Sequence, residues 1–64
     1  MTLSDFNKLS KEEKIEELQD NGELIDRAKG GKSFYSLHSF YVITKENKEE
    51  EIVSIRATLE EPSY

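Results

Sequence analysis

A two-residue period near the end of the chain restricts what this sequence can fold into. In residues 51–59, apolar positions alternate with a mixed set, Val53, Ile55, Ala57 and Leu59 against Ile52, Ser54, Arg56 and Thr58. Successive side chains of a strand point to opposite faces, so the first set is expected to face a core. Pro62 ends regular structure after this strand. The chain is therefore predicted to form a sheet with one buried face.

Two further segments have the composition of strands. Residues 32–37 and 39–45 are rich in Phe, Tyr, Val, Ile and Thr, which suit a pleated, half-buried surface. His38-Ser39 marks a bend or bulge between them, or an irregularity in one long strand. The polar residues 46–50 predict a turn before the last strand.

An earlier strand is predicted over residues 23–29, where the period changes from helical toward two. Gly30-Gly31 then offers a two-residue hairpin turn. The alternative is a second short helix that ends at Gly30, because Glu, Leu, Ala, Arg and Lys all tolerate helices.

A helix is predicted over residues 10–20. Ser10 and Glu13 have the spacing of a capping box, and Ile15 and Leu18 lie on one helical face. Asn21-Gly22 is expected to end the helix with left-handed residues. The preceding residues 4–9 are expected to form a turn or a short 3₁₀ segment that places Phe6 and Leu9 under the helix.

These elements describe a single α+β domain over residues 1–64, in which one N-terminal helix packs on an antiparallel meander of three to four strands. The predicted parts are an irregular lead-in (1–9), the helix (10–20), the sheet (23–59) and a tail (60–64). With 64 residues, only one small core can form. Its predicted members are Leu18, Phe40, Val42, Val53 and Ile55.

Charge and composition narrow the function classes. The formal net charge is −5, which opposes binding to phosphate backbones or anionic membranes. The chain has no cysteine, which fits a reducing compartment, and shows neither a signal peptide nor an apolar run long enough to span a bilayer. We therefore expect a cytoplasmic protein, with neither nucleic acid nor membrane as its partner.

Motifs for catalysis or cofactor binding are weak. Gly30-Gly31-Lys32-Ser33 resembles the end of a phosphate-binding loop, but position 26, where the motif begins with glycine, is Asp26, and a strand follows instead of a helix. His38 is the only histidine, so a zinc site is not expected, and its ring is predicted to face solvent without a partner.

Acidic residues are predicted to be solvated and not catalytic. The group Glu46, Glu49, Glu50 and Glu51 lacks the alternating spacing and internal glycine of a calcium loop. The helical pairs Glu12-Glu13 and Glu16-Glu17 sit among lysines as an exposed face. We expect no cofactor, no metal, no small-molecule substrate and no enzymatic activity.

The aromatic set Phe34, Tyr35, Phe40 and Tyr41 could form a base-stacking platform, but the basic surround of such a platform is missing from the sequence, so core and strand roles are favoured. If Phe40 and Val42 face the helix, apolar residues remain on the other face. Partner-binding residues are therefore predicted there: Tyr41, Ile43, Ile52 and Arg56.

The pattern Leu37-His38-Ser39-Phe40-Tyr41-Val42, followed after a charged turn by Ile52-Val53-Ser54-Ile55-Arg56, resembles a group of short uncharacterised bacterial proteins. These proteins carry similar L-x-x-F-Y-V and I-V-x-I signatures after a capped helix, and the resemblance spans roughly residues 6–59. It implies the same α+β fold, with no activity, cofactor or functional residue to transfer. It departs at Ile43 and Thr44, where a more polar and a more apolar residue, respectively, would be expected.

The function predicted from the sequence is a non-enzymatic interaction with another protein, or self-association as a homodimer, through the outer sheet face. The alternative is an acidic inhibitor or nucleic-acid mimic encoded by a mobile element, whose carboxylates occupy a basic groove on a host enzyme.

Overall fold

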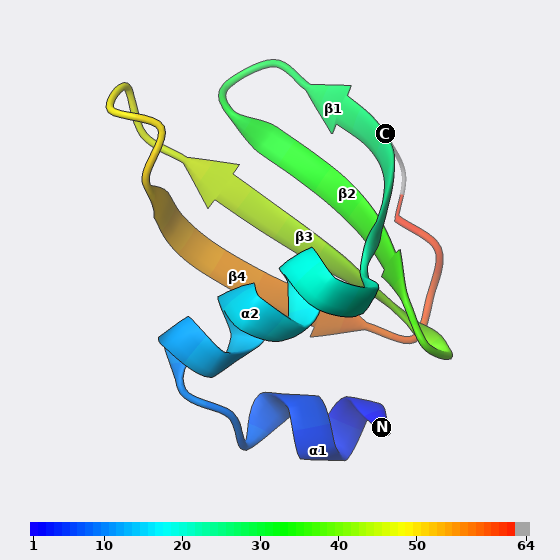
Figure 1. Cartoon of the computed structure of the whole chain (residues 1–64). Coiled ribbons are helices and arrows are strands. Elements are labelled where there is room, and N and C mark those ends of the chain that lie inside the picture. Colours follow the sequence, from blue (N-terminus) through cyan, green and yellow to red (C-terminus); the bar gives the residue numbers. More distant parts are fainter. Residues whose placement is uncertain (63–64) are drawn as a thin grey trace.

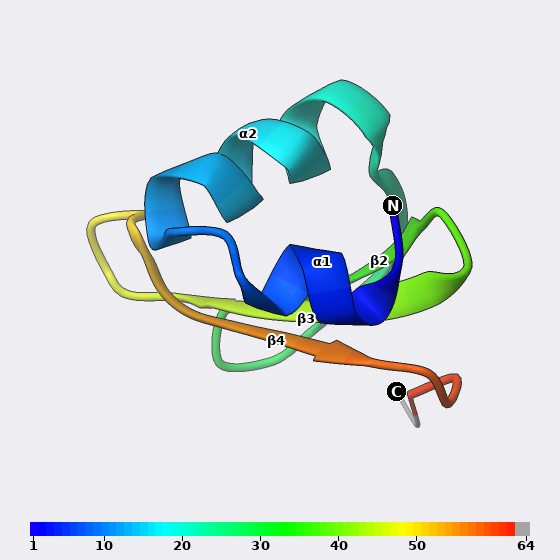
Figure 2. The same ribbon diagram turned by 90° about the horizontal axis from the view of Figure 1, so that it is seen from below.

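Two helices precede a four-stranded antiparallel sheet and lie together on one of its faces (Figures 1 and 2). The computed structural model describes residues 1–62. Its elements are α1 (Leu3–Asn7), α2 (Lys11–Asn21), β1 (Glu23–Ala28), β2 (Lys32–Leu37), β3 (Phe40–Glu46) and β4 (Ile52–Thr58). The predicted α+β class is confirmed.

The strands form a meander in the order β1-β2-β3-β4, so each strand pairs with its neighbour in sequence. Residues 23–28 form a strand, as predicted, and the alternative of a second short helix there is wrong. The first hairpin turn has three residues, Lys29 to Gly31, and not the predicted two, because Ala28 pairs with Lys32. Gly30 and Gly31 both have a positive φ in this turn. His38 also has a positive φ, of 55°, and with Ser39 it makes a tight turn that separates β2 from β3.

The capping box predicted for the longer helix is present at the start of α2. The Glu13 amide donates to Ser10 Oγ and the Ser10 amide donates to Glu13 Oε1, both at 3.2 Å. The predicted left-handed end is wrong, because Gly22 is extended with φ −76°. Glycine is favoured there by crowding, since a Cβ atom would lie 2.5 Å from the Leu18 carbonyl oxygen.

The predicted irregular lead-in contains a short α-helix, α1. Thr2 and Asp5 form a second capping box at its start, with the Asp5 amide donating to Thr2 Oγ1 at 3.2 Å. The cap offsets part of the cost of nucleating so short a helix. As predicted, the segment carries Phe6 into the core, where this side chain is fully buried.

The core lies between the two helices and the sheet (Figure 2). The rings of Phe6 and Phe40 meet with centroids 5.4 Å apart at an angle of 52°, a tilted geometry that aromatic pairs favour. Burial of Leu18, Phe40 and Val42 confirms those members of the predicted core. The complete buried cluster is Phe6, Leu18, Leu37, Phe40 and Val42, with Leu3, Leu9, Tyr35, Ile55 and Ala57 packed against it.

The inward face predicted for the last strand is correct only in its middle. Ile55 and Ala57 pack against the core, whereas Val53 is 52% exposed and Leu59 is 66% exposed. The pairing between β3 and β4 shifts register beside Val53, because Lys45 pairs with Ser54 and the next residue, Glu46, pairs with Ile52. Leu59 lies beyond the end of β4. Val53 is therefore not a core residue.

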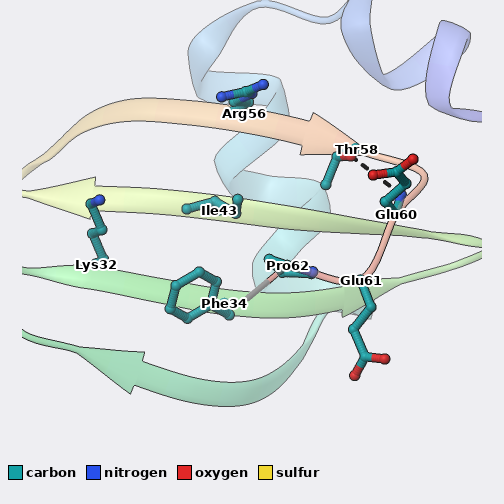
Figure 3. Close-up of a pocket in the computed structure, with 8 residues that line it drawn as sticks. All are labelled: Lys32, Phe34, Ile43, Arg56, Thr58, Glu60, Glu61 and Pro62. Carbon is teal, nitrogen blue, oxygen red and sulfur yellow. Dashed lines mark hydrogen bonds between the residues drawn. The ribbon is translucent and has the colours of Figure 1, made fainter. Parts of the chain in front are cut away.

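After β4 the chain turns and runs back to the face of the sheet that the helices leave open (Figures 2 and 3). Residues 60–62 of the predicted tail are part of this return, and positions 63 and 64 lie outside the described residues. None of the helices in residues 1–62 is long and apolar enough to cross a membrane.

Candidate functional site

The open face of the sheet carries a cluster of aromatic, aliphatic and cationic side chains, which we call the outer patch. Alternation places it: Tyr35 and Val42 pack toward the helices, so their sequence neighbours Phe34 and Ile43 point the other way. The outer patch consists of Lys32 and Phe34 from β2, Tyr41, Ile43 and Lys45 from β3, and Arg56 from β4.

Cross-strand pairing holds the outer patch together. Ile43 lies opposite both Phe34 on β2 and Arg56 on β4, so one row runs across three strands. Lys32 lies directly opposite Lys45 at one end of the patch. Tyr41 lies opposite Thr58 at the other end. The sheet therefore gives the patch an apolar centre with cations beside it.

Three of the predicted partner-binding residues share this face, and the fourth does not. Tyr41, Ile43 and Arg56 are all in the outer patch, and Tyr41 and Ile43 are half-buried. Ile52 pairs with Glu46, which lies on the same side of β3 as the buried Thr44. The register shift near Val53 thus removes Ile52 from the outer patch, and its predicted place beside Ile43 is wrong.

A shallow pocket of about 410 Å³ opens over the outer patch, between the sheet and the returning chain (Figure 3). Phe34 and Ile43 supply its apolar lining on the sheet, and Pro62 lies near Phe34. The full lining is Lys32, Phe34, Ile43, Arg56, Thr58, Glu60, Glu61 and Pro62.

Phe34 is only 5% exposed although it lies on the face away from both helices. The composition of residues 32–37 predicted a strand and core role for Phe34 but no contact with Ile43. The sequence contains the information for this pairing: if His38-Ser39 is a two-residue turn, Leu37 pairs with Phe40, and continuing along both strands pairs Phe34 with Ile43. The return of residues 59–62 had no comparable signal in the sequence.

The outer patch is basic in a chain whose net charge is −5. Lys32, Lys45 and Arg56 are exposed, and none of them forms an ion pair with a carboxylate of residues 1–62. Asp26 on β1 lies opposite Phe34, and its Oδ1 accepts the Arg27 amide at 2.7 Å. The sheet therefore brings three cations together on one face, with the carboxylate of Asp26 on the neighbouring strand.

A second polar contact joins the turn between β2 and β3 to α2. His38 Nε2 lies 2.8 Å from Glu17 Oε1, so the prediction of a histidine without a partner is wrong. The hydrogen bond with His38 lowers the pKa of Glu17, against the opposing effect of desolvation, and Asn21 Nδ2 also donates to Glu17 Oε1. The side chains of His38 and Glu17 are partly accessible to solvent, and their contact joins the turn between β2 and β3 to α2.

The remaining motifs have structural roles. Lys32 and Ser33 follow a hairpin turn and begin β2, as the rejection of a phosphate-binding loop required. Asn47 Oδ1 accepts the amides of Glu49 and Glu51, at 2.9 and 3.0 Å, and so organises the acidic turn. Within the described part of the chain, no three His, Cys, Asp or Glu side chains are grouped so as to hold a metal ion.

Comparison with known proteins gives no match to a protein family, to a curated protein or to a solved structure.

Proposed function

We propose that this chain is a non-enzymatic protein-binding domain that contacts a partner protein, or a second copy of itself, through the outer patch. The observation that supports this proposal is the row of Phe34, Ile43 and Arg56 across three strands, on the face opposite both helices. An apolar centre with charged residues at its margin is the usual anatomy of a protein interface.

Side-chain chemistry supports the same function. Tyr41 is half-buried on the inner strand β3, and a tyrosine ring has few rotatable bonds, so it can bury area against a partner at little entropic cost. Arg56 can bond carboxylates or backbone carbonyls with the several donors of its guanidinium group. Tyr41, Ile43 and Arg56 are therefore proposed as the anchors of the interface.

The alternative function is that of an acidic inhibitor or nucleic-acid mimic, and the distribution of charge over the molecule supports it as a second candidate. Exposed carboxylates of α2, at Glu12, Glu13 and Glu16, lie on the layer opposite the basic outer patch. In this second function, the helical layer would occupy a basic groove on another protein. The two functions thus use opposite layers of the molecule.

The test compares substitutions on the two layers. Tyr41→Glu and Ile43→Lys on the outer patch are compared with Glu16→Lys on α2 by light scattering and by affinity capture from the native cell. The proposal expects the first two variants to stay folded and to lose the associations of the wild type, while Glu16→Lys keeps them. The opposite pattern would favour the mimic, and retention by all three variants would refute both functions.

A further inference from the structure

The arrangement of the cations in the outer patch lowers the folding stability of the isolated domain. Lys32 and Lys45 stand directly opposite each other across β2 and β3, and like charges in that position are destabilising. Arg56 lies on the next strand, opposite Ile43. This arrangement would be relieved by an anionic group that binds among the three cations.

The chain itself brings acidic residues toward this surface. Residues 59–62 (Leu-Glu-Glu-Pro) follow β4, and the Glu60 amide donates to Thr58 Oγ1 at 3.2 Å where the chain turns. Glu60, Glu61 and Pro62 then line the same pocket as Lys32, Phe34 and Arg56 (Figure 3). In Figure 3, Pro62 lies near Phe34, whereas the Glu60 side chain lies beside Thr58 and the Glu61 carboxylate points away from Lys32 and Arg56. The segment therefore lies over the patch, and within residues 1–62 neither Glu60 nor Glu61 forms an ion pair with Lys32 or Arg56.

We propose that the outer patch binds an acidic, extended peptide segment of a partner protein, and that residues 59–62 compete with this segment for the surface. This inference rests on the proposed function and specifies the chemistry of the partner. Carboxylates of the segment would bind among Lys32, Lys45 and Arg56. An apolar residue between them would pack on Ile43, and on Phe34, which is 5% exposed, once residues 59–62 have been displaced.

The local charge of the surface, and not the net charge of the domain, decides this recognition. Charged groups separated by more than about 8–10 Å are largely screened at physiological salt, so a short peptide responds mainly to the cations that it touches. A long polyanion such as a nucleic acid would also approach the acidic remainder of the domain, including Asp26 on the neighbouring strand. A short acidic peptide is therefore favoured over a nucleic acid.

The test is an NMR titration of the full chain with two synthetic peptides, Leu-Glu-Glu-Pro-Glu-Glu-Leu and the same peptide with Lys in place of every Glu, and with a dT8 oligonucleotide. We expect the acidic peptide alone to shift the amide signals of Ile43 and Arg56. Arg56→Glu and Lys32→Glu should weaken its binding about tenfold or more, because bonds to charged groups are lost. Lys11→Glu, an equal charge change on α2, should have no such effect.

A double substitution tests the competing segment. Glu60→Gln with Glu61→Gln should strengthen acidic-peptide binding by several fold, because the segment loses two negative charges that repel an incoming acidic peptide while the cations remain. Unchanged affinity in this variant would refute the competition. Equal binding of the acidic and basic peptides, or tighter binding of the oligonucleotide, would refute the acidic-peptide specificity.

One of the same variants also serves as a control for the effect of charge on folding stability. Lys32→Glu converts the repulsion with Lys45 into an attraction, so it should raise the melting temperature while it weakens peptide binding. A lower melting temperature would refute the argument that the patch carries unrelieved repulsion. If Tyr41→Glu abolishes partner association but charge reversal leaves it intact, the protein-binding function stands and the acidic partner is wrong.

Discussion

The central strand β3 contains a buried hydroxyl group whose removal should stabilise the protein. Thr44 is fully buried, and its Oγ1 atom has no hydrogen-bond partner within residues 1–62. A buried polar group without a partner costs about 1–3 kcal/mol. Thr44→Val keeps the branched shape and its strand preference while replacing the hydroxyl with a methyl group.

The expected gain is large for a domain of this size. A chain this short has a stability of about 3–10 kcal/mol, and 1 kcal/mol shifts the melting temperature of such a domain by about 4–8 °C. Thr44→Val should therefore raise the midpoint of a thermal melt by about 4 °C or more.

Thr58→Val is the matched control, because its hydroxyl accepts the Glu60 amide at 3.2 Å near the end of β4. This variant should leave the melting temperature unchanged or lower it slightly. Circular dichroism melts and urea titrations of the two variants measure the difference. If Thr44→Val melts at or below the wild-type temperature, the assignment of Thr44 to an unsatisfied core position is wrong.

Three further predictions follow from burial, backbone geometry and charge. Phe6→Ala should cost about 3–5 kcal/mol because Phe6 is fully buried, whereas Val53→Ala should stay within about 0.5 kcal/mol because Val53 is exposed, and urea unfolding measures the stability of both variants. Gly31→Ala should destabilise more than Gly30→Ala in the same assay: both have positive φ, but only at Gly31 would a Cβ atom collide with a carbonyl of the β3 end. The folded-state pKa of Glu17 is lowered, so its contact with His38 should contribute its full stability above the ordinary glutamate pKa of about 4.3. This contribution should be lost as the pH falls through the lowered pKa. Glu17→Gln should therefore be less stable than the wild type at neutral pH, and denaturant unfolding should show that this difference disappears in acid.

The sequence predicted the elements whose signals are local. Ser10 and Glu13 identified the start of α2, and the pair Gly30-Gly31 identified the first hairpin, because capping and turn chemistry depend on neighbouring residues only. The short helix α1 was missed, since five residues are too few to show a helical period. Its capping box, Thr2 with Asp5, was the available signal.

Features that depend on pairing between strands were predicted less well. Alternation alone put Val53 in the core and Ile52 on the outer face, but the register shift at the start of β4 reverses this part of the pattern. Tyr41, Ile43 and Arg56 were placed on the correct face because they lie beyond the shift. Contacts between distant segments, such as Glu17 with His38, left no periodic signal in the sequence.

The central claim is that a partner binds the outer patch. The most direct measurement places a photo-crosslinking amino acid at Tyr41 or, as the helical control, at Glu12, and irradiates each protein in its native cell. We expect a discrete protein adduct from position 41 that is lost when Arg56→Glu is added, and no such adduct from position 12. An adduct from position 12 alone, or one from position 41 that is unaffected by Arg56→Glu, would contradict this claim.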